Sequence, residues 1–248
     1  MTEQRITSRK NPLLQKVRKL LSSRTERESA GLFAAEGTKL LAEAARWSEV
    51  DTVILADGVD AQIPDRAQLV RVPCDIMEAV STMQSPQGAL FLCRLPQKKA
   101  FTPLPGMLLL DGIQDPGNLG TILRTADALD IPVALLEGCA DPYSHKVVRA
   151  SMGAVFRRPP QQTTWESAYT ACVQKGIAIA VTALSKQAQD LRDAPLKGMA
   201  VVIGSEGQGV RQEIMQNAQT RLVIPMNPHC ESLNAGIAAA IVMWQMKQ

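Results

Sequence analysis

Three turns in this sequence carry residue types that could bind a ligand or act on one, and each turn directly follows an apolar run. They are DPGNLGTILRTA at residues 115–126, GSEGQGV at 204–210 and IPMNPHCESLNAG at 224–236. Such runs predict buried parallel strands, and an open parallel sheet binds its ligands beyond the carboxyl ends of its strands. A functional site is therefore expected where these three turns meet.

Each turn also has a simpler interpretation. Asn118 and Arg124 lie near the start of a helix expected to begin around Leu119, so Arg124 could reach back over the turn or pair with Asp127 on the surface. In the second turn, three glycines surround Glu206 and allow close backbone approach to a ligand, but Glu206 could equally cap a helix.

The third turn precedes a helix rich in small residues. Ser232 and Asn234 are ordinary helix N-caps at this position. The alanines and Gly236 that follow allow close packing, so this helix is expected to lie against the sheet or against a partner.

The elements that position these turns form two domains. Alternating strands and helices predict a small α/β domain over residues 1–95, and the proline-rich stretch 96–106 reads as a linker. Residues 107–248 contain continuous apolar strands alternating with helices, which predicts a parallel sheet covered on both faces.

Charge is concentrated at the N-terminus. The formal net charge is +3, but residues 1–27 alone contain eight Lys or Arg and two Glu. Asn11 and Pro12 predict the start of an amphipathic helix whose polar face carries several of these cations. A basic surface of this kind favours a polyanion such as nucleic acid, although a solvated helix face is an equally good explanation of the charge alone.

The remaining composition predicts neither a metal site, nor disulfides, nor a membrane segment. The five cysteines include no CxxC pair, and the adjacent His229 and Cys230 have no second pair of ligands. The N-terminus lacks an apolar signal core, and the apolar segment 235–244 is too short to cross a bilayer. We therefore expect a soluble cytoplasmic protein with reduced thiols.

The three turns, in this order and spacing, resemble the motifs of the SpoU/TrmH branch of the SPOUT superfamily. The members of this branch are S-adenosylmethionine-dependent RNA 2′-O-ribose methyltransferases. The segment DPYSHKVVRASMGAVF at residues 141–156 belongs to the same resemblance. NPLLQKVRKLL and FAAEGTKLL also look like the substrate-binding domain often attached to this branch. The third motif departs from the usual pattern at His229, Cys230 and Ala235-Gly236, while its SLN core is intact.

The resemblance implies a Rossmann-like α/β domain with a C-terminal trefoil knot, preceded by the smaller RNA-binding domain. It also implies a homodimer formed through the C-terminal domain, with RNA as substrate. The two-domain organisation resembles enzymes that act on large-subunit ribosomal RNA more than the tRNA enzymes, so ribosomal RNA is the expected substrate. S-adenosylmethionine would be the cofactor, held by the second and third turns. The implied cofactor-binding residues are Leu184, Gly204, Glu206, Gly207, Ile224, Met226, Ser232 and Leu233.

Catalytic and RNA-binding roles follow from the same resemblance. Arg124 would be the key catalytic residue, and because arginine holds its proton firmly we assign it to phosphate binding and alkoxide stabilisation rather than to general base catalysis. The implied catalytic set is Arg124, Asn118, Glu206, Ser232 and Asn234. The expected RNA contacts are Arg9, Lys10, Lys16, Arg18, Lys19, Lys146 and Arg149.

Other functions remain open at this point. A tRNA 2′-O-methyltransferase and a non-catalytic RNA-binding or ribosome-assembly protein would share the fold. A nucleotide-dependent oxidoreductase is disfavoured because no GxGxxG follows the first strand of the C-terminal domain.

Overall fold

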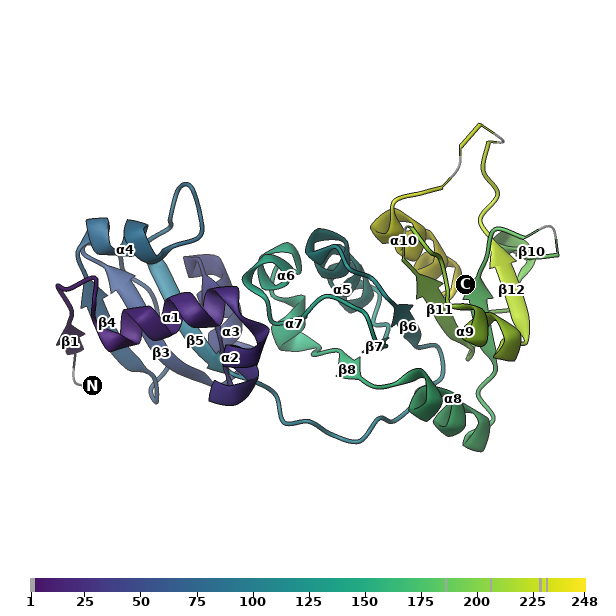
Figure 1. Ribbon diagram of the computed structural model, residues 1–248, viewed down its shortest axis with the longest axis horizontal. Helices are drawn as coiled ribbons and strands as arrows, with labels where there is room; N and C mark the ends of the chain where they lie inside the picture. The colour runs from purple at the N-terminus through teal and green to yellow at the C-terminus, as the bar shows by residue number, and fades with distance from the viewer. Residues whose placement is uncertain (1–2, 186, 206, 228, 231) are drawn as a thin grey trace. The chain divides into compact units, whose positions relative to one another are not determined.

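The computed structural model describes residues 3–185, 187–205, 207–227, 229–230 and 232–248, which form two compact units (Figure 1). Unit 1 contains the chain up to Gln97 together with Asp141–Arg157. Unit 2 contains Lys98–Ala140 and Arg158–Gln248. Both units are α/β, which confirms this part of the predicted fold.

Unit 1 is built on a five-stranded mixed sheet in the order β1-β4-β3-β5-β2. Strands β1, β4 and β3 are parallel, whereas β5 runs antiparallel to both β3 and β2. The sequence analysis did not anticipate β1 or β4, which pair with each other at one edge. The strands are β1 (Glu3–Arg5), β2 (Leu32–Glu36), β3 (Val50–Ala56), β4 (Gln68–Val72) and β5 (Ala89–Arg94).

Alternating strand residues of unit 1 bury two cores, one on each face of its sheet. Phe33 and Phe91 point to one face, where they meet the helix α3. Leu90 and Leu92 point to the other face, across which α1 lies (Figure 1). The helices of unit 1 are α1 (Pro12–Ser22), α2 (Arg24–Ala30), α3 (Thr38–Trp47), α4 (Cys74–Val80), α6 (His145–Ala150) and α7 (Ala154–Arg157).

The segment Asp141–Arg157 packs in unit 1, although the sequence analysis assigns it to the domain spanning 107–248. Phe156 stacks on Phe33 with ring centroids 6.0 Å apart, and Tyr143 also contacts Phe33. The Arg27 guanidinium forms a buried ion pair with Asp141 at 2.5 Å. Burial of these aromatic side chains explains why the segment completes the core of unit 1.

Unit 2 is a seven-stranded parallel sheet in the order β10-β12-β9-β11-β6-β7-β8. Residues of its central strands β6, β9 and β11 are almost fully buried, as expected for a sheet covered on both faces. The strands are β6 (Leu108–Asp111), β7 (Val133–Leu135), β8 (Gln161–Gln162), β9 (Ile179–Thr182), β10 (Gln189–Asp190), β11 (Ala200–Gly204) and β12 (Thr220–Val223).

The helix after the first of the three turns begins earlier than predicted. Asp115 is its N-cap and accepts a hydrogen bond from the Asn118 N–H at 2.7 Å, with Pro116 as the first helical residue. Asn118 therefore lies in the first helical turn, not before the helix. The helices of unit 2 are α5 (Pro116–Ala128), α8 (Trp165–Gln174), α9 (Gln212–Asn217) and α10 (Ala235–Gln245).

Among the described residues, no helix combines the length and the apolar character needed to span a bilayer. The same part of the chain contains no group of three or more His, Cys, Asp or Glu side chains arranged to hold a metal ion.

Candidate functional site

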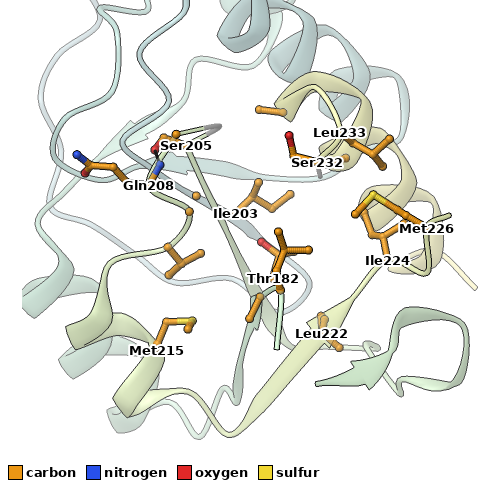
Figure 2. Close-up of a pocket in the computed structure, with 18 residues that line it drawn as sticks. Thr182, Ile203, Ser205, Gln208, Met215, Leu222, Ile224, Met226, Ser232 and Leu233 are labelled. Carbon is orange, nitrogen blue, oxygen red and sulfur yellow. Dashed lines mark hydrogen bonds between the residues drawn. The ribbon is translucent and has the colours of Figure 1, made fainter. Parts of the chain in front are cut away.

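A cavity of about 350 Å³ lies at the carboxyl ends of β9, β11 and β12 in unit 2 (Figure 2). In Figure 2, Ile224, Met226 and Leu233 lie on one side of it and Gln208 and Met215 on the other. The structure brings together seven of the eight residues that the resemblance assigns to the cofactor, while Glu206 lies outside the described residues. The seven are Leu184, Gly204, Gly207, Ile224, Met226, Ser232 and Leu233.

The second turn folds back tightly on the end of β11. The Gly209 N–H donates to the Ser205 carbonyl at 2.9 Å, and the Gln208 N–H donates to the Ser205 hydroxyl at 3.3 Å. A Cβ atom at Gly204 would lie only 2.0 Å from the carbonyl carbon of Gly209. This close approach of two backbone segments requires glycine at position 204.

The sequence analysis did not assign eleven further cavity residues of the described ranges to the cofactor, although five of them, Ser205, Gln208, Gly209, Val210 and Ala235, lie within the turns that it identified. Thr182, Ile203 and Leu222 lie at or near the carboxyl ends of their strands, where the rule that located the three turns could have found them. No sequence signal marked Met215, which reaches the cavity from α9. The others are Ala183, Ser205, Gln208, Gly209, Val210, Ala235 and Ala238.

A pair of amides joins the first turn to the third. The Asn234 Nδ2 group donates to the Asn118 Oδ1 atom at 2.9 Å. The Asn234 Oδ1 atom caps α10 by accepting from the Gly236 and Ile237 N–H groups at 2.9 and 3.3 Å. The helices α5 and α10 pack together beside this pair, with a Cβ at Gly236 reaching 3.4 Å from the Thr121 methyl. The two predicted asparagines therefore join the first turn to the third through a side-chain hydrogen bond.

Arg124 lies on an exposed face of α5. Six residues separate it from Asn118, so the two side chains leave the helix in directions about 120° apart. No hydrogen bond or ion pair joins Arg124 to another residue within the described ranges. Its guanidinium thus remains available to a ligand, although the structure does not pair it with Asn118. Ser232 lines the cavity and is exposed.

The predicted RNA contacts all belong to unit 1. Several cations of the N-terminal region already have protein partners: Arg9 pairs with Asp75 at 2.7 Å, and Lys19 lies 3.8 Å from Glu26. The Arg18 guanidinium donates to the Ala79 carbonyl at 3.2 Å. Lys10 and Lys16 are exposed.

Lys146 and Arg149 are exposed one helical turn apart on α6. Because α6 packs on β2, these two cations share a unit with the N-terminal basic helix. The sequence alone had placed them in the other domain.

The fold and the cavity define an α/β protein with a small-molecule site at the carboxyl edge of a parallel sheet. Residues 105–244 match the SpoU rRNA Methylase family, and residues 11–90 match the MRM3-like substrate binding domain. The chain belongs to the SpoU rRNA methylase family.

Individual relatives agree with this assignment. The 23S rRNA (guanosine(2553)-2′-O)-methyltransferase RlmP of Bacillus subtilis is 31% identical over 98% of both chains. The structure of a putative RNA methyltransferase of the TrmH family from Porphyromonas gingivalis is 33% identical, covers 94% of this chain and 96% of its own, and superposes with a TM-score of 0.85. An AdoMet-bound rRNA methyltransferase from Sinorhizobium meliloti is 26% identical, covers 99% and 97%, and has a TM-score of 0.88.

Proposed function

We propose that this protein transfers a methyl group from S-adenosylmethionine to a ribose 2′-hydroxyl of ribosomal RNA. The observation that carries the proposal is the cavity formed by the second and third turns, in a chain of the SpoU rRNA methylase family. RlmP, which shares the full length of this chain, supports both the 2′-hydroxyl and the ribosomal substrate. The AdoMet-bound relative supports the cofactor.

The cavity residues fit S-adenosylmethionine. A volume of about 350 Å³ lies at the lower end of the range for small-molecule sites. Its walls at Ile203, Leu222 and Ile224 are apolar and suit a purine ring. The second turn, residues 204–210, hereafter the glycine turn, offers backbone N–H and C=O groups to the polar edges of the ligand. When bound, S-adenosylmethionine supplies a methyl group on a positively charged sulfur.

The chain's own residues would hold and activate the ribose. The exposed Arg124 guanidinium binds an RNA phosphate and stabilises the negative charge that develops on the 2′-oxygen. Asn118 and Asn234 hold the first and third turns together, so that Ser232 faces the cavity at a fixed position. Glu206 is assigned to the same network by the family resemblance alone.

Unit 1 would contribute contacts to the RNA substrate. Lys10, Lys16, Lys146 and Arg149 are exposed cations in this unit and suit contact with phosphates. Arg9 and Lys19 would first exchange a carboxylate partner for the RNA. We retain the whole predicted set as RNA contacts on this basis.

We further propose that a second copy of the chain covers α10. Ile237, Ile241 and Trp244 are 53%, 39% and 62% exposed and form one stripe at i, i+4 and i+7. The stripe adjoins a hollow lined by Leu191, Ile224 and other residues. Exposed apolar stripes of this kind mark protein interfaces. Light scattering should show that Trp244→Glu dissociates a dimer, whereas Val173→Glu, at an exposed apolar position on α8, should not.

The family's trefoil knot is also part of the proposal. The second and third turns line the same cavity although a helix and a strand separate them, which is the juxtaposition that a knot formed by these segments requires.

The function is tested with labelled S-adenosylmethionine and separate pools of unmodified ribosomal RNA and tRNA. Alkali-resistant linkages are then mapped, because a 2′-O-methyl group blocks alkaline cleavage. We expect one resistant linkage in ribosomal RNA, its loss in Arg124→Ala, and full activity in Arg158→Ala, a partly buried arginine of the same unit that pairs with Asp130. Label in tRNA alone would change the substrate class. Cofactor binding without label in either pool would contradict the proposed reaction.

A further inference from the structure

A buried carboxylate lies at the base of the glycine turn. Asp111 ends β6, and its side chain is only 1% exposed. In the parallel register it lies opposite Gly204, the residue at which the turn leaves β11. Both of its oxygens are used by the residue at which the turn ends: Oδ2 accepts from the Arg211 N–H at 2.9 Å, and Oδ1 accepts from the Arg211 Nε–H at 2.7 Å.

Arg211 carries the connection further. Its Nη2 group donates to Glu137 Oε2 at 2.9 Å, and its Nη1 group lies 3.0 Å from Glu213 Oε1. Glu137 follows β7 and also accepts from the Trp165 N–H that begins α8. The Arg211 guanidinium therefore connects the end of the turn to Asp111 at the end of β6 and to Glu137 just after β7. Through Glu137 it is also connected to the start of α8.

The electrostatics agree with a formed, ionised network. Burial lowers the pKa of Arg211, but its hydrogen bonds and attraction to Glu137 and Asp111 outweigh this and raise it above the ordinary value. Burial raises the pKa of Glu137, but hydrogen bonds from its own backbone, Arg211 and Trp165 leave it below the ordinary value. Charge-assisted hydrogen bonds of this type are stronger and more directional than neutral ones.

We propose that Asp111 and Arg211 are positioning residues that hold the glycine turn in its ligand-binding form before the cofactor enters. The inference rests on the proposed function, because it assigns the turn to S-adenosylmethionine. The turn leaves the sheet beside Asp111 and is returned to it by Arg211, so the pair closes the loop at its base. A turn whose two ends are already fixed in the free protein loses less conformational entropy when the ligand binds.

Arginine is required for this role and lysine cannot replace it. The backbone N–H would still reach Asp111 in Arg211→Lys, but a single ammonium group cannot donate to Asp111 and Glu137 with the geometry of the planar fork. The variant keeps the charge and removes the directional bonds. It is therefore a test of positioning rather than of electrostatics.

Binding of S-adenosylmethionine by calorimetry and amide hydrogen exchange of the free protein form the experiment. For Arg211→Lys we expect the dissociation constant to rise at least tenfold and exchange to accelerate more in the peptide covering 204–211 than in the rest of unit 2. The matched control is Arg158→Lys, which alters an exposed ion pair with Asp130 in the same unit. The control should leave affinity within twofold and exchange in 204–211 unchanged.

The outcomes separate the inference from the function on which it rests. If the wild-type protein does not bind S-adenosylmethionine, the proposed function fails. If the wild type binds and Arg211→Lys binds equally well, with unchanged exchange in the turn, the positioning role is refuted. Glu137→Gln keeps both Asp111 contacts and provides a second variant; it should weaken binding less than Arg211→Lys, and an equal or larger loss would assign the effect to Glu137 instead.

Discussion

Replacing Gly204 with alanine would test whether the shape of the glycine turn determines cofactor affinity. The added Cβ would lie 2.0 Å from the Gly209 carbonyl carbon, 2.2 Å from its oxygen and 2.2 Å from the Val210 nitrogen. All three atoms belong to the backbone, so no side-chain rotation can relieve the overlap. The two backbone segments must separate by about 1.4 Å to reach ordinary contact distance.

A displacement of this size should reduce cofactor affinity strongly, because the overlapping residues Gly204, Gly209 and Val210 all line the cavity. Misplacement of a site by about 1 Å can reduce function about 100-fold. We therefore expect the dissociation constant for S-adenosylmethionine to rise by ~100-fold, equivalent to about 2.7 kcal/mol. Isothermal titration calorimetry measures this directly, and near-UV circular dichroism confirms that the variant is folded.

Gly207→Ala is the matched control for this experiment. It lies in the same turn and lines the same cavity, but a Cβ at this position meets no atom within 4 Å. Because Gly207 itself lines the cavity, some loss of affinity is expected, but one much smaller than that of Gly204→Ala. If Gly204→Ala binds as tightly as Gly207→Ala, the tight return of the turn onto β11 is not what forms the binding site, and the reasoning is refuted.

Three further results are expected. Asn234→Ala removes the N-cap of α10 and should lower the free energy of unfolding by about 1 kcal/mol, measured by thermal unfolding. Asn234→Asp keeps the cap but loses the donor to Asn118, so it should reduce methyl transfer with a much smaller loss of stability. Equal melting temperatures for the two variants would contradict this. Because the pKa of Glu137 is lowered on folding, its carboxylate stabilises the protein above the unfolded pKa of about 4.3, and this contribution is lost as the pH falls through the folded value. The melting-temperature difference between wild type and Glu137→Gln should therefore be larger at neutral pH than at about pH 3, and a constant difference would argue against the linkage. Partial burial raises the pKa of the Cys139 thiol to about 11. A native titration with a thiol reagent at neutral pH should therefore modify the exposed Cys74 and Cys230 rapidly and leave Cys93, Cys139 and Cys172 slow. Rapid reaction of Cys139 would contradict the raised pKa of its thiol.

Much of the fold and of the candidate site could be predicted because local patterns report them well. Continuous apolar runs identified the central strands of the C-terminal sheet, since a strand buried on both faces has no polar side. Parallel strands present their carboxyl ends at one edge, so the three turns were expected to meet at one site. The family resemblance then assigned residues as distant as Gly204 and Leu233 to one cavity, which they both line. The order of the motifs pointed to the family.

Local patterns did not show which segments pack together across the chain. The short strands β1 and β4 carry little periodicity and are stabilised by pairing with each other and with β3, which no window of sequence contains. The earlier start of α5 depended on how the Asp115 side chain turns back to the Asn118 N–H, a choice that the Asp-Pro pattern allowed but did not require.

The sequence by itself determined the fold class, the three turns and the chemical character of the site. Only the tertiary structure decided that Asp141–Arg157 completes the core of unit 1, and that Arg211 closes the glycine turn through Asp111. Both depend on contacts between residues about 100 positions apart in the chain. Such contacts are selected by the burial of aromatic rings and the pairing of buried charges in three dimensions, which leave no periodic trace along the sequence.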